Sequence, residues 1–139
     1  RIWLLGIVLC LGLLSACEKN DASSESEEIQ VVTTIAQIAD VVENVGGNLV
    51  EVQSLMGPGV DPHLYNAVQG DIETLERAEI IFYNGLHLEG QMDEIFVQMQ
   101  NQKPTIAVTE QIDSAKLLAD PENEQVYEPH VWFDISICK

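Results

Sequence analysis

Basic residues are scarce in this chain. Its 139 residues include 6 Lys and Arg against 23 Asp and Glu, which gives a formal net charge of −17. Nucleic-acid binding and electrostatic docking on anionic lipid both depend on Lys and Arg, so both functions are disfavoured. Hydrophobic residues nevertheless make up 46% of the chain, which is too many for a wholly disordered protein, and the length suits one domain with its own core.

Common enzyme signatures are also missing. The sequence contains no His-Glu-x-x-His helix, no Gly-x-Ser-x-Gly turn around a nucleophilic serine and no glycine-rich loop that would cradle a phosphate. We therefore expect a binding protein rather than an enzyme. A metal-dependent hydrolase that uses His63 and His130 stays open as an alternative, because catalytic zinc needs an open coordination position and a base for its water.

The first 17 residues have the composition of an export signal. Arg1 precedes an unbroken apolar run at 2–14, which is shorter than the ~20 residues that a membrane-spanning helix needs. The following Leu14-Ser15-Ala16-Cys17 resembles a bacterial lipobox. This resemblance implies that Cys17 becomes the lipidated first residue of the mature protein, with enough acyl chains for stable anchoring. The alternatives are an ordinary secretory signal and a membrane anchor helix.

An acidic tether and a folded domain are expected to follow this signal. Residues 18–28 alternate serine with acidic side chains and include no large apolar residue, so this segment cannot bury enough surface to fold. If Cys10 leaves with the signal and Cys17 is lipidated, Cys138 has no intrachain disulfide partner, and we interpret it as a small buried hydrophobic residue. Both ends of the sequence lack the features of natural termini, and we interpret the chain as a fragment.

From residue 29 onward, β-branched runs alternate with amphipathic helical patterns. The runs typical of strands are 29–34, 49–55, 80–83 and 105–109. Apolar residues recur at helical spacing between these runs, and Asp71 is the expected cap of the second helix. This alternation predicts an α/β fold in which a four-stranded, mostly parallel sheet is flanked by helices. Ligands of such sheets bind beyond the carboxyl ends of the strands.

Two histidines occupy matching positions in this pattern. Asp61-Pro62-His63 follows the second strand, and Glu128-Pro129-His130 follows the long loop after the fourth. Proline stiffens the backbone before each imidazole, and imidazole is the commonest metal ligand near neutral pH. The carboxylates of Asp61 and Glu128 can orient the rings through their second nitrogen. We expect both rings to meet and bind a divalent ion; the alternative is that each histidine caps a helix or fills the core.

Other side chains near these motifs have less defined roles. His87 lies just past the third strand, where it would be a metal ligand, an outer partner of a ligand ring or a surface residue. Trp132 and Phe133 flank His130 and are expected in the core, where they would hold the imidazole rigidly. Tyr65 would either close over the site or pack locally.

Three segments of the chain together resemble one protein family. Residues 56–65 (MGPGVDPHLY), 78–89 (AEIIFYNGLHLE) and 128–134 (EPHVWFD) are similar, in the same order, to the solute-binding lipoproteins of bacterial manganese and zinc ABC importers. The resemblance covers residues 29–139, with Glu128 at a position where aspartate is usual. It implies that the chain is the N-terminal lobe of a two-lobed protein, and that the C-terminal lobe and most of the connecting helix are absent.

The resemblance also implies a metal site and a transport role. That family holds one metal between its lobes, and His63 and His130 match its two N-lobe ligands, so the site is incomplete in this chain. The cargo would be Mn²⁺ or Zn²⁺, with manganese or mixed specificity favoured because residues 111–127 lack a histidine-rich loop. The expected partners are an ABC permease and, through Cys17, membrane lipid.

We expect this protein to be monomeric and exported, on the outer face of the cytoplasmic membrane. The remaining alternative is a surface adhesion lipoprotein without a metal.

Overall fold

The computed structural model describes residues 28–121, 123, 126–134 and 136–137. The expected export signal with Cys10 and Cys17, the tether up to residue 27, and Cys138 lie outside the described residues, so those assignments stay predictions. None of the helices in the described part of the chain is long and apolar enough to cross a membrane.

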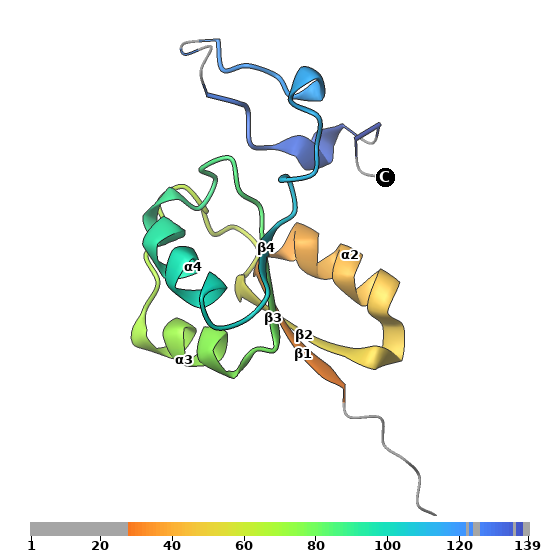
Figure 1. Cartoon of the computed structure of the whole chain (residues 1–139), viewed down its shortest axis with the longest axis vertical. Helices are drawn as coiled ribbons and strands as arrows, with labels where there is room; N and C mark the ends of the chain where they lie inside the picture. Colours follow the sequence, from red (N-terminus) through yellow and green to blue (C-terminus); the bar gives the residue numbers. More distant parts are fainter. Residues whose placement is uncertain (1–27, 122, 124–125, 135, 138–139) are drawn as a thin grey trace, which may run out of the picture.

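Four parallel strands form one sheet (Figure 1). They are β1 (Ile29–Ile35), β2 (Val50–Met56), β3 (Ile80–Tyr83) and β4 (Thr105–Ala107), in the spatial order β2-β1-β3-β4. Val31 of the central strand pairs with Val52 on one side and with Ile80 on the other. This arrangement confirms the predicted α/β class and the four-stranded sheet, although β4 ends two residues earlier than expected.

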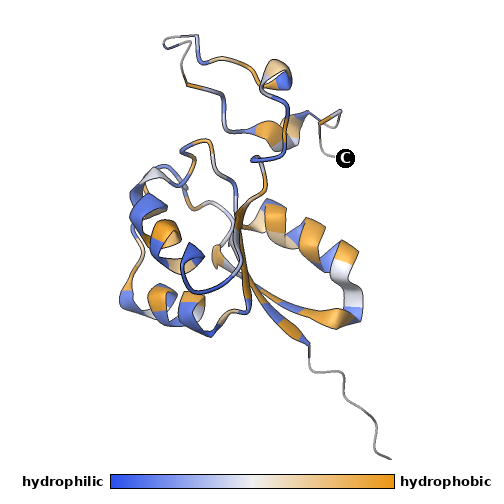
Figure 2. Cartoon of the chain, viewed as in Figure 1, coloured by the Kyte–Doolittle hydropathy of each residue, from blue (hydrophilic) through white to orange (hydrophobic). Residues whose placement is uncertain are grey.

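Helices cover both faces of the sheet. The first helix, α2 (Ala36–Gly46), lies on one face, and α3 (Gln69–Arg77) and α4 (Asp93–Gln100) lie on the other, which gives three layers (Figure 1). Hydrophobic residues follow the strands, and hydrophobic and hydrophilic residues alternate along α3 and α4 (Figure 2). The buried core draws on every layer, and its members include Val32, Ile35, Ile38, Met56, Leu75, Ile81, Leu88, Met92, Phe96 and Met99.

Charged side chains stabilise both ends of α3. The helix begins at Gln69, two residues before Asp71, so Asp71 caps it as predicted, but from the first turn and not from the position before the helix. Asp71 lies in the first turn, where its Oδ2 accepts hydrogen bonds from the backbone N–H of Val68 (2.8 Å) and from the Tyr65 hydroxyl (2.7 Å). At the other end, Lys103 Nζ donates to three backbone carbonyls at 2.9, 2.6 and 2.7 Å, which places a cation at the negative end of the helix dipole.

The carboxyl edge of the sheet carries the loops that form the candidate site. After β1 the chain enters α2 on one face, whereas after β3 it enters α4 on the other, so the two central strands mark the switch point at which such folds bind ligands. The segment that follows β4, with the short 3₁₀ turns η4 (Ser114–Lys116) and η5 (Val131–Phe133), passes over this edge at the top of Figure 1.

Candidate metal centre

His63 lies in the loop that follows β2. The φ of Gly59 is 84°, in the left-handed region that favours glycine, and Val60 N–H donates to the Gly57 carbonyl at 3.3 Å, so the chain turns sharply there. Asp61 Oδ1 then accepts the backbone N–H of His63 at 2.9 Å. Asp61 therefore fixes the backbone that presents the imidazole, and the contact with the His63 ring that the sequence led us to expect is replaced by this turn.

His130 is held through its ring as well as its backbone. Glu128 Oε1 pairs with Nδ1 of the imidazole and accepts the backbone N–H of the same residue at 3.4 Å. The hydrogen bond from His130 lowers the pKa of the Glu128 carboxyl, which keeps this group charged near neutral pH. A carboxylate at Nδ1 favours the tautomer with the proton on that nitrogen, and this leaves the Nε2 lone pair available to a metal. The predicted contact between Glu128 and the ring is present.

The two imidazoles meet although 67 residues separate them. His63 Nε2 lies 3.5 Å from His130 Nε2, and the ring centroids are 5.4 Å apart with an interplanar angle of 62°. In a tetrahedral site with metal–nitrogen bonds of ~2.1 Å, two ligand nitrogens are about 3.4 Å apart. The observed separation therefore suits two ligands of a single ion. His63 follows one edge strand and His130 follows the other, so both loops reach inward over the central strands.

The remaining coordination positions have no ligand in the part of the chain that the structure describes. Those residues contain no group of three or more His, Cys, Asp and Glu side chains that could hold a metal ion. The His87 side chain is 78% exposed, and its Nδ1 lies 3.1 Å from Asp93 Oδ2, which corresponds to the surface alternative for this residue. A metal held by the two imidazoles would take its other ligands from water or from a different part of the protein.

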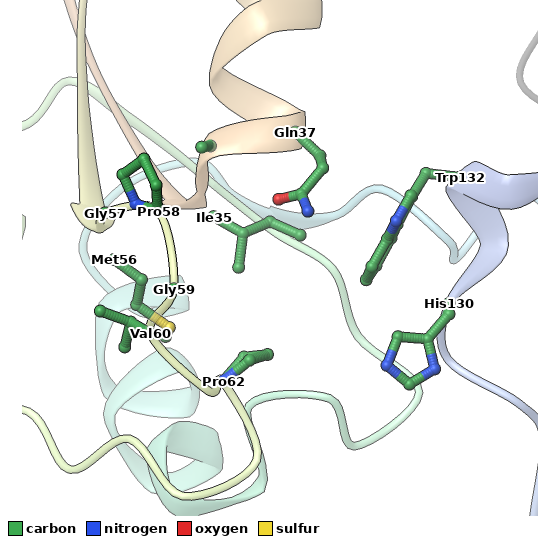
Figure 3. Close-up of a pocket in the computed structure, with 11 residues that line it drawn as sticks. Ile35, Gln37, Met56, Gly57, Pro58, Gly59, Val60, Pro62, His130 and Trp132 are labelled. Atoms are coloured by element: carbon green, nitrogen blue, oxygen red, sulfur yellow. The ribbon is translucent and has the colours of Figure 1, made fainter.

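A cavity of about 380 Å³ lies beside His130 (Figure 3). Its walls come from the start of α2, the loop after β2 and η5, and they include Ile35, Gln37, Met56, Val60, Pro62 and Trp132. Figure 3 shows the rings of His130 and Trp132 next to each other, with Pro62 and Val60 across the cavity. Most of this lining is apolar, and an apolar surround limits the access of water to a metal ligand.

The two aromatic residues after His130 have different surroundings. Trp132 packs against the core, and its ring centroid lies 5.2 Å from that of the imidazole in an edge-to-face arrangement. Phe133 is 80% exposed, so the prediction that it belongs to the core is wrong for this lobe. The reason is local geometry, because successive residues of a 3₁₀ turn point about 120° apart and only one of the two can face the sheet. Tyr65 packs locally through its bond to Asp71.

Two buried polar residues at the carboxyl edge were not recognised from the sequence. Asn84 and Glu89 are each 1% exposed. The Asn84 side chain donates to the carbonyl of Pro129 at 3.0 Å, and the Glu89 carboxylate accepts a hydrogen bond from the Thr34 hydroxyl at 2.5 Å. Burial raises the pKa of Glu89.

Comparison with known proteins supports one family. The model of the zinc-uptake complex component A periplasmic family (ZnuA) matches residues 31–139. The chain is 46% identical over 125 residues to the manganese-binding lipoprotein MntA of Bacillus subtilis. This match covers 89% of the chain and 40% of MntA. It is 33% identical over 138 residues to the metal ABC transporter substrate-binding lipoprotein FimA of Streptococcus parasanguinis, with 94% of the chain and 44% of the relative covered.

A solved structure gives the same result. The zinc-binding protein TroA of Treponema pallidum is 45% identical over 134 residues, covering 94% of the chain and 42% of TroA. The solved structure of this periplasmic zinc-binding protein is similar to that of the present chain, with a TM-score of 0.75 and 46% sequence identity. The match covers 79% of this chain and 39% of the TroA chain. The chain thus spans about two fifths of the length of these relatives. It belongs to the family of zinc-uptake component A periplasmic solute-binding proteins, and its described part matches their N-terminal lobe.

Proposed function

We propose that this chain is the metal-capturing lobe of an extracytoplasmic lipoprotein that binds Mn²⁺ or Zn²⁺ and delivers it to an ABC importer. The observation that carries the proposal is the 3.5 Å separation between the Nε2 atoms of His63 and His130. Relatives at 46% and 45% identity are named for manganese binding and zinc binding, and FimA is named as a metal ABC transporter substrate-binding lipoprotein. These names support both the class of cargo and the importer.

The proposed chemistry is the binding of one divalent ion by two neutral imidazoles. Glu128 supports it, because a carboxylate that accepts from Nδ1 fixes the orientation of the ring and leaves Nε2 free to bind a metal. The resemblance to the family implies two further ligands from the second lobe. Zn²⁺ binds nitrogen donors more tightly than Mn²⁺ does, so these ligands and metal availability would decide which ion is carried. The two imidazoles alone leave most of the coordination shell to water, and we expect weak binding by the 139-residue chain itself.

The same proposal places the protein outside the cytoplasmic membrane. Lipid on Cys17 would anchor it, and the acidic segment 18–28 would let the folded lobe reach an ABC permease. The names of the relatives, which refer to metal binding and to metal ABC transporters, favour capture and delivery over hydrolysis. The names of the relatives favour transport over adhesion.

The test is metal binding by the full-length protein with His63→Ala or His130→Ala. Binding to the folded state alone stabilises it by mass action, so Mn²⁺ or Zn²⁺ should raise the melting temperature of the unmodified protein. Both variants should lose most of this shift and bind more weakly in competition with a chelator. His87→Ala is the matched control, because its exposed imidazole pairs with Asp93, and it should keep the shift. An unchanged shift in both ligand variants would contradict the proposal.

A further inference from the structure

A buried carboxylate joins the ends of the two central strands. Glu89 Oε1 accepts hydrogen bonds from the Thr34 hydroxyl at 2.5 Å and from the backbone N–H of Asn84 at 2.8 Å, and Oε2 accepts the N–H of Gly85 at 3.3 Å. Thr34 belongs to β1, whereas Asn84 directly follows β3. A buried carboxylate is costly unless its oxygens are hydrogen-bonded, and three donors, one in β1 and two just after β3, meet this need. Glu89 thus occupies the switch point of the sheet, below the loops that carry the histidines.

The loop that Glu89 holds has an unfavourable backbone conformation. Gly85, Leu86 and His87 have φ values of 84°, 53° and 60°, so three successive residues lie in the left-handed region. Leucine and histidine reach this region only at a cost in free energy, which the surrounding structure must offset. A Cβ at Gly85 would lie 2.8 Å from Thr109 Oγ1, so the loop is also pressed against the residues that follow β4. The N–H of Gly85, the first residue of this stretch, is bonded to the Glu89 carboxylate.

Asn84 connects the left-handed loop to the loop that carries His130. Its carbonyl accepts the Thr109 hydroxyl at 2.7 Å, and its side-chain Nδ2 donates to the carbonyl of Gly85 at 2.9 Å and to that of Pro129 at 3.0 Å. Proline has no backbone N–H, so the carbonyl is the one backbone group through which Pro129 can be held. That carbonyl belongs to the peptide bond that leads into His130. The same carbonyl accepts the N–H of Val131 at 2.9 Å, so a residue that follows β3 is bonded to the segment that carries an imidazole 46 positions later in the chain.

We propose that Glu89 and Asn84 are positioning residues of the metal site. Glu89 holds the left-handed loop, the loop presents Asn84, and Asn84 fixes Pro129 so that the His130 ring stays within reach of His63. This inference rests on the proposed function, because it assigns a role in metal binding to two residues whose bonds are to other parts of the protein. The alternative is that they stabilise the fold alone.

The experiment compares Asn84→Ala and Glu89→Gln with matched controls in the full-length protein. Glutamine at position 89 offers one acceptor oxygen and turns an N–H₂ toward donors that need acceptors. Glu79→Gln is its control, because the Glu79 carboxylate also accepts a backbone N–H, that of Gln30 at 3.0 Å, at the opposite edge of the sheet. Asn101→Ala is the control for asparagine, because the Asn101 side chain donates to a carbonyl within α4.

Each variant is studied with Zn²⁺ by chelator competition and with Co²⁺ by absorption spectroscopy, at a temperature at which its unfolding curve shows it to be fully folded. We expect Asn84→Ala and Glu89→Gln to bind Zn²⁺ roughly 10 to 100 times more weakly and to alter the Co²⁺ spectrum, as is common when a residue that orients a ligand is lost. Both controls should keep the affinity and the spectrum of the unmodified protein.

A purely structural role would give a different pattern. If Asn84→Ala lowers the melting temperature and leaves the affinity and the Co²⁺ spectrum unchanged, the inference is overturned. Thr34→Val removes one donor to Glu89 while keeping the side-chain shape, and it replaces Glu89→Gln if that variant does not fold. The proposed function is tested separately. If His63→Ala loses binding and Asn84→Ala binds normally, the positioning role alone is rejected. If His63→Ala and His130→Ala both bind normally, the metal site itself is rejected.

Discussion

The loops that carry His63 and His130 have similar sequences but support their imidazoles in different ways. In the first loop, Asp61 accepts the backbone N–H of the histidine at 2.9 Å. In the second, Glu128 pairs with Nδ1 of the ring while the backbone N–H lies at 3.4 Å. The additional methylene of glutamate lets its carboxylate reach past the backbone to the imidazole. Glu128 therefore keeps a negative charge beside the loop and orients the ring of its own histidine.

The loops also differ in how far their anchors lie along the chain. The loop of His63 is tied down locally, since the Tyr65 hydroxyl donates to Asp71, six residues later, at 2.7 Å. The loop of His130 has local supports as well, in Glu128, and in addition a distant one, because Asn84 bonds to Pro129 across 45 residues. The first loop is thus held by nearby residues, whereas the second is also bonded to a residue that follows β3. Changes in the two loops should have correspondingly different effects.

The largest difference is expected between Glu128→Gln and Asp61→Asn. Glutamine weakens the hold on Nδ1 and removes the negative charge beside the ring, so Zn²⁺ affinity should fall by about 10 to 100 times. Asparagine keeps an oxygen that can accept the same backbone N–H, so Asp61→Asn should bind Zn²⁺ nearly as well as the unmodified protein. Chelator competition measures both, and equal losses in the two variants would show that the acidic residues act in the same way.

Tyr65→Phe should have a smaller effect, on stability rather than on metal binding. The variant loses the hydrogen bond to Asp71, and the free energy of unfolding in urea should decrease by about 1 kcal/mol. Burial and the neighbouring Asp71 raise the pKa of Tyr65 to about 12, so its phenolate should form only in strongly alkaline solution, as followed by ultraviolet absorption. A loss of Zn²⁺ affinity as large as that of Glu128→Gln would mean that this loop is not secured locally.

The smallest effects are expected in the pH dependence of stability, where Glu89 and Glu128 should act in opposite directions. Burial raises the pKa of Glu89, so protonated Glu89 stabilises the folded state at low pH. This contribution is lost as the pH rises through the raised pKa. The bond from His130 lowers the pKa of Glu128, so its contribution is present above the ordinary carboxyl pKa and is lost as the pH falls through the lowered value.

Urea unfolding of the metal-free protein from about pH 3 to pH 8 measures both contributions. Glu89→Gln should remove the part of the curve that declines with rising pH, and Glu128→Gln should remove part of the decline at acidic pH. Glu79→Gln serves as the control for the loss of a carboxyl group at a distant edge of the sheet. A curve of unchanged shape in Glu89→Gln would contradict the assignment of that buried group.

The sequence predicted the strands and helices well because each pattern repeats within a few residues. Alternating and helical spacing of apolar residues identified three helices and four strands, with small errors at their ends. Asp71 shows the source of these errors: it caps α3 from inside the first turn, and a sequence pattern does not distinguish this position from the one before the helix. Phe133 was misplaced because hydrophobicity does not reveal which side of a short turn faces the sheet.

The amino-acid sequence alone determined the α/β class and the stiff Pro-His loops, because these features depend on neighbouring residues. Only the tertiary structure decided that two imidazoles 67 residues apart come within 3.5 Å, and that Glu89 bonds to Asn84 and Asn84 to Pro129. Such contacts depend on the order of the strands and on the direction in which the chain leaves each one. That order is settled by the packing of the whole lobe, and no local pattern specifies it.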